Sequence, residues 1–169
     1  MVVWLIGLSG SGKTTIGSAF YQRVKLKKEA TVLVDGDGIR AIFKHESYHD
    51  YSVNGRRISA ERLQEICLWL DKQGLDVVCC NLGIFDDINL KNREIFSDYR
   101  EVFIDVSIDK LIAQDNKCLY QSALRGEQTN VVGIDIQYTP PCSPDLTIKN
   151  SQKLEDVSSY VDKIISICN

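Results

Sequence analysis

The sequence predicts an α/β fold in which a mostly parallel sheet lies between two layers of helices. Short apolar runs of strand length alternate with longer segments whose apolar residues recur at helical spacing. A chain that alternates strand and helix in this way forms a parallel sheet covered by helices on both faces. A glycine-rich loop follows the first apolar run. With 169 residues, 44% of them hydrophobic, the chain has the size and the core material of one domain, which we expect to span residues 1–169.

The first half of the pattern begins with an apolar run at residues 2–6 that is rich in β-branched residues, as in a strand covered on both faces. After the glycine-rich loop, residues 13–25 have helical periodicity. Residues 31–34 form a second short apolar run, and the acidic and glycine residues at 35–38 predict that this strand ends in a turn.

The second half continues the alternation. A long helix is expected over residues 59–72, beginning near Arg56 and Arg57 and ending at Gly74, a residue type that favours helix C-termini. The remaining predicted elements are a strand at 75–80, a helix at 89–98, a strand at 101–106, an edge strand at 146–148 and a helix at 153–167. Periodicity is lost between residues 115 and 144, and so long an irregular stretch is more often functional than idle.

Charge and hydropathy exclude several classes of function. The net charge of −3 and a sequence pI near 5.4 argue against a nucleic-acid partner, because the phosphate backbone requires a basic surface. No apolar run reaches the roughly 18 residues that span a bilayer, and no signal segment is recognised, so no membrane contact and a cytoplasmic location are expected. The six cysteines have no metal-ligand spacing and are expected to be reduced, buried thiols.

The glycine-rich loop carries the strongest motif. Its pattern, Gly-x4-Gly-Lys-Thr between a strand and a helix, is that of a phosphate loop, which specifies the fold class further as a three-layer α/β/α P-loop NTPase type. Backbone N–H groups and the helix N-terminus would surround the phosphates of ATP. Lys13 would reach the β and γ phosphates, and the Thr14 hydroxyl would bind Mg²⁺. The predicted ATP-binding residues are Gly7, Ser9, Gly10, Ser11, Gly12, Lys13, Thr14 and Thr15.

A phosphate loop alone does not separate a kinase from a GTPase or an ATP-driven machine. The segment at residues 35–40 stands at the end of the second strand, where open parallel sheets bind their ligands. Asp35, Asp37 and Arg40 there provide a candidate general base, a magnesium partner and an anion clamp. An acidic turn held by a salt bridge is the structural alternative.

Several motifs occur along the chain in a fixed order: the loop from Gly7 to Thr15, the Asp-Gly-Asp-x-Ile-Arg segment from Asp35, Tyr51-Ser52 with Arg56, Lys117-x-Leu119-Tyr120, Ala123-x-Arg125-Gly126-Glu127, and Gly133-Ile134-Asp135 with Tyr138 and Pro141. In these motifs, and over nearly its whole length, the chain resembles the adenylylsulfate kinases. The resemblance implies transfer of the γ-phosphate of ATP to the ribose 3'-hydroxyl of adenosine 5'-phosphosulfate. It also implies a lid at about residues 114–144 and a homodimer.

The resemblance also implies residue roles. The catalytic residues would be Asp37, the best candidate for the base, Asp35, a magnesium or orienting partner, and Lys13. Arg40 and Arg56 would hold the phosphate-like group of the acceptor, and Lys117 would neutralise charge from the lid.

Departures from the family pattern concern the acceptor. Val131 and Val132 replace a phenylalanine and a threonine, and the phenylalanine ring stacks on the acceptor adenine; losing that face would cost about 1–3 kcal/mol of stacking energy. Ser59 replaces an asparagine on the long helix, and Tyr51 stands opposite Val131. Further differences occur at Asn54, Gly55, Leu82-Gly83-Ile84, Asp86 and Gln114. Tyr51, Ser59 and Val131 therefore complete the predicted acceptor site with Asp35, Arg40, Arg56 and Lys117.

Because the phosphate loop is intact, we expect a kinase with a changed acceptor. The chain is similar to the branch of this family that phosphorylates the 3'-hydroxyl of cytidine diphosphoramidate in capsule biosynthesis. Adenylylsulfate itself remains the alternative acceptor. A regulator that binds ATP without chemistry is the alternative of another class, although the retained Asp35, Asp37, Arg40 and Lys117 argue against it.

Two further patterns favour structural interpretations. The string from His45 to His49 matches the zinc-protease pattern His-Glu-x-x-His, but its residues favour a solvated loop over the helix that such a site requires. Trp4 and Trp69 lie in apolar patterns and are expected in the core.

Overall fold

The fold is known from a computed structural model, which describes residues 1–43, 50–115 and 118–168. Within these residues, five parallel strands form one sheet in the order β2-β3-β1-β4-β5. The strands are β1 (Val2–Ile6), β2 (Thr31–Asp35), β3 (Asp76–Cys80), β4 (Tyr99–Asp105) and β5 (Leu146–Lys149). The helices are α1 (Lys13–Lys25), α2 (Gly36–Ile42), α3 (Val53–Lys72), α4 (Asp86–Ile95), α5 (Ile108–Gln114), α6 (Leu119–Leu124) and α7 (Val157–Cys168), with a 3-10 turn, η2 (Leu154–Asp156), before α7.

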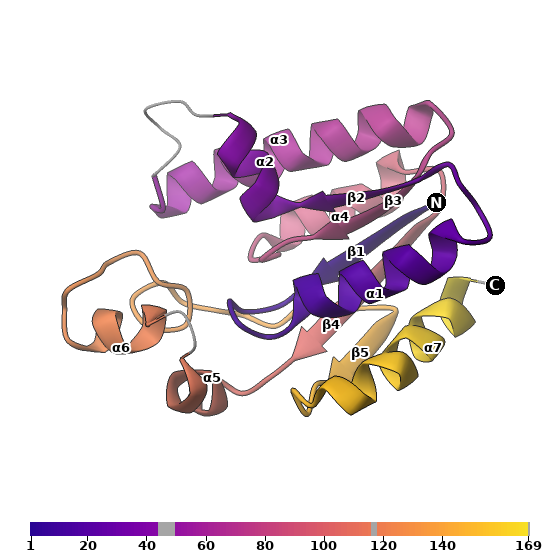
Figure 1. Cartoon of the computed structure of the whole chain (residues 1–169). Helices are drawn as coiled ribbons and strands as arrows, with labels where there is room; N and C mark the ends of the chain where they lie inside the picture. Colours follow the sequence, from indigo (N-terminus) through magenta and orange to yellow (C-terminus); the bar gives the residue numbers. More distant parts are fainter. Residues whose placement is uncertain (44–49, 116–117, 169) are drawn as a thin grey trace.

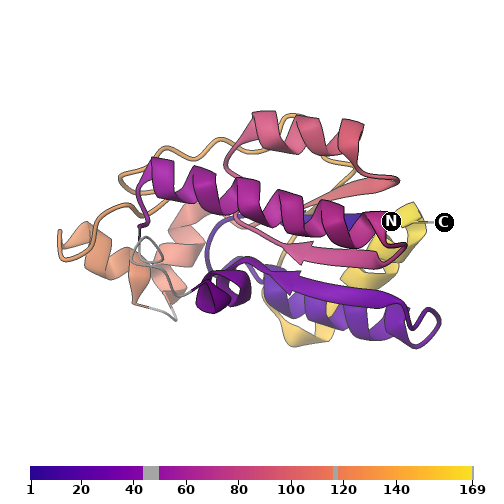
Figure 2. The ribbon, with the colours of Figure 1, turned by 90° about the horizontal axis from the view of Figure 1, so that it is seen from above.

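The sheet separates two hydrophobic cores, so the predicted three-layer α/β/α architecture is confirmed. Side chains of β1 alternate between the faces: Val3 and Leu5 pack with α1 and α7, whereas Val2, Trp4 and Ile6 pack with α3. Helices α1 and α7 cover one face, and α3 and α4 cover the other (Figure 1). Viewed from above, α3 and α4 lie side by side over the sheet (Figure 2).

The carboxyl ends of the strands point toward one end of the molecule, where α5 and α6 lie (Figure 1). The phosphate-loop segment leaves β1 at this end, and α2 follows β2 there. The topology therefore gathers the loops that follow the strands, as expected for the ligand side of an open parallel sheet.

The predicted turn at residues 35–38 is wrong, because α2 begins at Gly36, directly after β2. The side chain of Asp35 accepts hydrogen bonds from the backbone N–H groups of Asp37, at 2.9 Å, and Gly38, at 3.4 Å. This N-cap satisfies donors that a new helix would otherwise leave unpaired. The acidic and glycine residues that indicated a turn are the start of a helix.

Other boundaries differ in smaller ways. Helix α3 begins at Val53 because Ser52 caps it, its hydroxyl accepting from the Gly55 N–H at 3.1 Å. Helix α7 begins at Val157, after η2. The stretch from residue 115 to 144 contains a short helix, α6, which its sequence did not reveal.

Some predictions of burial are also wrong. Trp69 is 64% exposed, because the buried stripe of α3 runs through Leu63 and Cys67, and a residue two positions after Cys67 points away from it. Trp4 is buried as expected. All six cysteines are free thiols, but Cys118 and Cys142 are exposed.

Candidate functional site

The phosphate loop connects β1 to α1 and is shaped by three glycines with positive φ: Gly7 (149°), Gly10 (77°) and Gly12 (94°). A β-carbon on Gly12 would lie 2.5 Å from Asn150 Nδ2, so the glycine also allows a close approach of side chain to backbone. That amide nitrogen donates to the Ser11 carbonyl at 2.7 Å. The loop is thus held from beneath by the segment that follows β5.

Lys13 and Thr14 begin α1 at the mouth of this loop. Lys13 Nζ donates to the Leu8 carbonyl at 2.7 Å, so its ammonium group folds back over the loop. Thr14 Oγ1 donates to Asp35 Oδ2 at 2.8 Å. This bond joins the loop after β1 to the end of β2, two segments 21 residues apart in the sequence.

Asp35 has a double role in this arrangement. Its Oδ1 caps α2, and its Oδ2 meets the Thr14 hydroxyl. The carboxylate of Asp35 is therefore fixed beside the phosphate loop. Asp37 is exposed in the first turn of α2 and lines the same cavity.

Two arginines and a tyrosine form a second group of polar side chains. The guanidinium carbons of Arg40 and Arg56 lie 5.2 Å and 5.3 Å from the ring centroid of Tyr51, within the range of cation–π attraction. Arg40 Nη1 donates to Ser59 Oγ at 3.2 Å. Arg40 Nε is buried and has no hydrogen-bond partner within the described part of the chain.

Arg56 bridges the start of α3 to Asn130 in the segment after α6. Its Nε donates to the Tyr51 carbonyl at 2.9 Å, and its Nη2 donates to the Asn130 carbonyl at 2.7 Å. Desolvation and the neighbouring Arg40 lower the pKa of Arg56 from its ordinary value. A guanidinium is still charged at neutral pH, so a partly desolvated positive charge faces the cavity.

A cavity of about 470 Å³ runs between the phosphate loop, α2, the start of α3 and the segment that contains α6 and Val132, a volume suited to a small-molecule site. The sequence-predicted residues that line it are Ser9, Gly10, Gly12, Lys13, Thr14, Thr15, Asp35, Asp37, Arg40, Tyr51, Arg56 and Val131. Gly7 and Ser11 are buried in the loop beneath. Lys117 lies outside the described residues, as does the string from His45 to His49.

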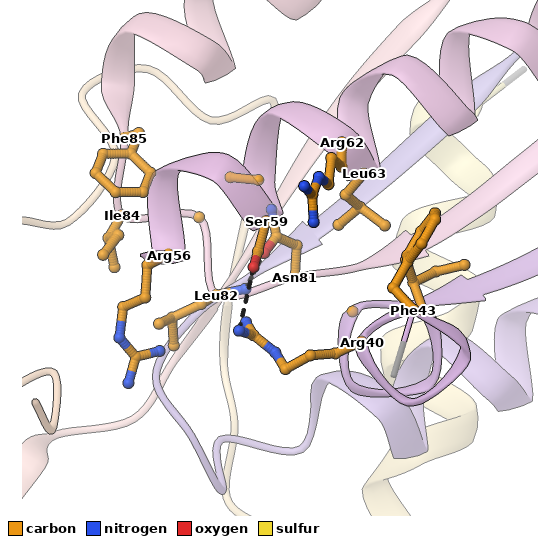
Figure 3. Close-up of a pocket in the computed structure, with 14 residues that line it drawn as sticks. Arg40, Phe43, Arg56, Ser59, Arg62, Leu63, Asn81, Leu82, Ile84 and Phe85 are labelled. Atoms are coloured by element: carbon orange, nitrogen blue, oxygen red, sulfur yellow. Dashed lines mark hydrogen bonds between the residues drawn. The ribbon is translucent and has the colours of Figure 1, made fainter. Parts of the chain in front are cut away.

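A side pocket of about 60 Å³ adjoins this cavity (Figure 3). Ser59 lies in its wall, with the Arg40 hydrogen bond directed to it, and Phe43, Leu63 and Phe85 contribute apolar surface. Arg40 and Arg56 line both spaces. The side pocket thus combines positive charge with apolar walls.

Helix α6 contacts the phosphate loop. Tyr120 Oη, in α6, donates to the Ser9 carbonyl at 2.7 Å. Burial and the nearby Asp115 raise the pKa of Tyr120 to about 12, so its hydroxyl keeps its proton at neutral pH. Val131 and Val132 are buried with Leu8 in one apolar cluster.

The arginines near the start of α3 do not act as one cluster. Arg57 forms a bidentate pair with Asp87, at 2.8 Å and 3.1 Å, and its guanidinium lies over the ring of Phe85. Arg62 lies over the ring of Phe43. Only Arg56 of the three lines the large cavity.

Sequence reasoning missed several wall residues. Asn81 follows β3 directly and lines both spaces, and its Oδ1 accepts from the Leu82 N–H at 2.6 Å. Its position at the carboxyl end of a parallel strand could have identified it as a site residue, because open parallel sheets bind ligands there. Tyr120 and Asn130 join the site through contacts with Ser9 and Arg56, which are distant in the sequence, and no local pattern indicates such contacts.

Within the described residues, none of the helices is both long and apolar enough to cross a membrane.

Three comparisons relate this geometry to known proteins. Residues 1–149 match the family model described as adenylylsulphate kinase. The chain is 39% identical over 168 residues to the cytidine diphosphoramidate kinase of Campylobacter jejuni, covering 98% of this chain and 96% of that protein. It is 34% identical over 168 residues to an adenylyl-sulfate kinase of Pseudomonas aeruginosa, covering 98% and 83%. A solved APS kinase of Mycobacterium tuberculosis, in complex with AMPPNP and APS, superposes with a TM-score of 0.83 at 28% identity, covering 99% and 96% of the two chains.

Proposed function

The chain belongs to the adenylylsulphate kinase family, and from this membership we propose that it transfers the γ-phosphate of ATP to the ribose 3'-hydroxyl of cytidine diphosphoramidate. The observation that carries the proposal is one cavity that is lined both by the phosphate loop and by Asp37, Arg40 and Arg56. Such a cavity can hold a phosphate donor and a hydroxyl acceptor together.

ATP is the proposed donor, held by the phosphate loop with Lys13 at the outer phosphates. The Thr14 hydroxyl and the Asp35 carboxylate, 2.8 Å apart, are the hard oxygen donors that Mg²⁺ prefers, so these residues fit the ion. When bound, Mg²⁺ would neutralise charge on the phosphates. Protein side chains need to supply only one or two of its ligands, because phosphates and water supply the others.

Asp37 is the proposed general base. It lines the same cavity as Lys13 and Thr14 and is on the first turn of α2, so its carboxylate can reach a hydroxyl placed between the two walls. As the bond from the 3'-oxygen to the γ-phosphorus forms and the bond to the ADP oxygen breaks, Asp37 would take the hydroxyl proton. Asp35, fixed by Thr14 and by the backbone of α2, would orient the reacting groups.

The acceptor is proposed to extend from Tyr51 and Val131 toward the side pocket. Arg40 and Arg56 would hold the anionic 5' group, with Ser59 beside them and Lys117 added from the lid. The 39% identity to a cytidine diphosphoramidate kinase and the absence of an aromatic residue at positions 131 and 132 support a cytidine acceptor.

Adenylylsulfate is the second candidate acceptor, because an APS kinase in complex with AMPPNP and APS shares the fold at 28% identity. Steady-state assays with both nucleotides distinguish the two. We expect kcat/KM for cytidine diphosphoramidate to exceed that for adenylylsulfate by about tenfold or more, equivalent to about 1.4 kcal/mol of transition-state binding. Phosphorus NMR of the product would locate the new phosphate on the 3'-oxygen. A preference for adenylylsulfate would overturn the acceptor assignment.

Replacement of Asp37 tests the base. We expect Asp37→Asn to lower kcat by about 10²- to 10⁴-fold while the affinity for ATP stays within about twofold, because a proton acceptor is lost without a phosphate contact. Asp162→Asn, on the surface of α7 and remote from the cavity, is the control and should retain full activity. Full activity of Asp37→Asn would exclude the role of general base. If the wild-type protein turned over none of the 3'-hydroxyl acceptors, the result would favour an ATP-binding regulator.

We also propose that residues 1–169 act as one kinase domain in the cytoplasm, with a lid at about residues 114–144, and as a homodimer. The homodimer is inferred from the family resemblance. Light scattering of the purified protein should give twice the chain mass of 19.1 kDa. A mass of one chain at working concentration would exclude it.

A further inference from the structure

A carboxylate outside the proposed catalytic set organises the lid turn at residues 130–136. Asp135 Oδ2 accepts from the Asn130 N–H and Oδ1 from the Val131 N–H, each at 2.5 Å. Desolvation favours the protonated form, but the backbone N–H groups of Asn130, Val131 and Asp135 itself, together with the positive charge of Arg56, lower the pKa of Asp135. Both oxygens of an ionised Asp135 are therefore committed to the backbone of this turn.

The turn presents one carbonyl to the acceptor wall. Asn130 has a φ of 63°, in the left-handed region, and its carbonyl accepts from Arg56 Nη2 at 2.7 Å. Asparagine is one of the few residue types other than glycine that adopt this region, and the hydrogen bond from its own N–H to Asp135 holds the turn in this conformation. The direction of this carbonyl thus depends on Asp135.

Arg56 connects the Asn130 carbonyl to the proposed acceptor site. With Nη2 on the lid and Nε on the Tyr51 carbonyl, the guanidinium plane is fixed at two points. In this plane it lies over one side of the Tyr51 ring, and Arg40 lies near the same ring. Arg56 also lines the large cavity. Its fixed guanidinium therefore borders the space in which Arg40 and Arg56 are proposed to hold the anionic 5' group of the acceptor.

We propose that Asp135 is a positioning residue for the acceptor, acting through the Asn130 carbonyl on Arg56; this inference rests on the proposed function of the same site. The hydrogen bonds of the Asp135 carboxylate go to two backbone nitrogens of the lid, each at 2.5 Å, and not to the phosphate loop. Its influence should therefore reach the acceptor and leave the ATP phosphates unaffected.

Asp135→Asn tests the proposal with little change of shape. The amide keeps one acceptor oxygen but places an NH₂ group against the second backbone N–H, so the turn loses one bond and gains a repulsive contact. We expect the acceptor KM to rise about tenfold, with kcat and the KM for ATP within about twofold. Asp109→Asn, an exposed aspartate on the lid-side helix α5, is the matched control and should match the wild type.

The route through Arg56 is tested by a double-mutant cycle. Arg56→Ala alone should raise the acceptor KM, and adding Asp135→Asn should change it by less than about twofold, because the carbonyl then has no guanidinium to hold. Additive effects, equal weakening of ATP binding, or an Asp135→Asn enzyme that behaves as the wild type would each overturn the proposal.

Failure of the proposed function is distinguishable from failure of this inference. Calorimetric titration with cytidine 5'-diphosphate and with adenosine 5'-phosphosulfate, without ATP, measures acceptor-side affinity in the absence of turnover. A wild-type protein that binds one of these but transfers no phosphate counts against the kinase reaction alone, and the ratio of wild-type to Asp135→Asn affinity still decides the role of Asp135. Binding of neither nucleotide counts against both.

Discussion

Gly12 combines two properties that no other residue type provides, a φ of 94° and room for Asn150 at 2.5 Å from where a β-carbon would be. We expect Gly12→Ala to weaken ATP binding by about 10- to 100-fold, since turning the loop amides away loses charge-assisted hydrogen bonds of about 1.5–3 kcal/mol. Calorimetric titration with a non-hydrolysable ATP analogue measures this.

Gly74→Ala is the matched control for Gly12→Ala. Gly74 has a φ of 80°, but a β-carbon added there would meet no atom within 4 Å, and the residue follows the C-terminal end of α3, away from the loop. It should lose about 1–2 kcal/mol of folding stability from backbone strain and retain ATP affinity. Weakened ATP binding in Gly74→Ala would show that general destabilisation explains the Gly12 effect.

At the residue scale, the sequence predicts where polar site residues lie better than it predicts burial. The positions of Lys13, Thr14 and Asp35 around one cavity were predictable, because the loop motif fixes the first two and the third ends a parallel strand. Trp69 was not, because an apolar residue in an amphipathic helix can lie just outside the buried stripe. Asn130 was not predictable either, because its carbonyl accepts a hydrogen bond from Arg56, which is 74 residues away in the sequence.

A hydroxyl group of α6 donates a hydrogen bond to the phosphate loop. We expect Tyr120→Phe to cost about 1 kcal/mol of local stability, the net value of a typical hydrogen bond, and to speed amide exchange in α6. A looser lid should also admit water, so ATP hydrolysis without acceptor should rise. Hydrogen-exchange mass spectrometry and an ATPase assay measure the two effects.

Tyr21→Phe is the control for Tyr120→Phe, because the Tyr21 hydroxyl accepts from Lys25 Nζ on the exposed side of α1. Neither α6 exchange nor ATP hydrolysis should change in this variant. Unchanged α6 exchange in Tyr120→Phe would mean that the Val131 and Val132 cluster holds the lid without the hydroxyl.

Elements differ in how far the sequence reveals them. Strand β1 and helix α1 have the predicted bounds, because a continuous apolar run and a segment of helical periodicity meet at a glycine loop that separates them. Helix α2 was missed because Asp35, which is equally typical of a turn, is a helix cap, and both structures use the same residue types. Helix α6 is too short for its periodicity to rise above the polar residues around it.

At the scale of the whole molecule, a buried acid predicts how stability depends on pH. Glu101, in β4, is 3% exposed, and burial raises its pKa above 4.5 even though the Tyr99 hydroxyl donates to it at 3.0 Å. The folded state therefore holds this proton more tightly than the unfolded state. Its contribution to stability is fully present below pH 4.5 and is lost as pH rises through the folded-state pKa.

Glu101→Gln should remove the loss of folding stability that ionisation of Glu101 causes at higher pH. The difference in unfolding free energy, variant minus wild type, should become more favourable to the variant as pH rises from about 4.5, and urea denaturation at several pH values measures it. Glu94→Gln, at an exposed position of α4, is the matched control. A difference for Glu101→Gln that does not change with pH would contradict the assignment.

The parallel sheet with helices on both faces was predictable from the alternation of elements, because few connections satisfy the handedness of such crossovers. The strand order β2-β3-β1-β4-β5 could not be predicted in the same way, because each strand is apolar enough to take several places in the sheet. The part of the site that follows the ends of strands, such as Asp35, was predictable. The part formed by residues 118–132 was not, because it depends on contacts between segments that are distant in the sequence.

The position of β1 between β3 and β4 has a consequence for synthesis of the chain on the ribosome. The strand made first is central, and its partners begin at residues 76 and 99, so it has no native neighbour in the sheet until a large part of the chain has been translated. Both of its edges stay open meanwhile, and an apolar strand with open edges pairs readily with other chains. Premature termination before residue 76 would thus release a fragment prone to aggregation.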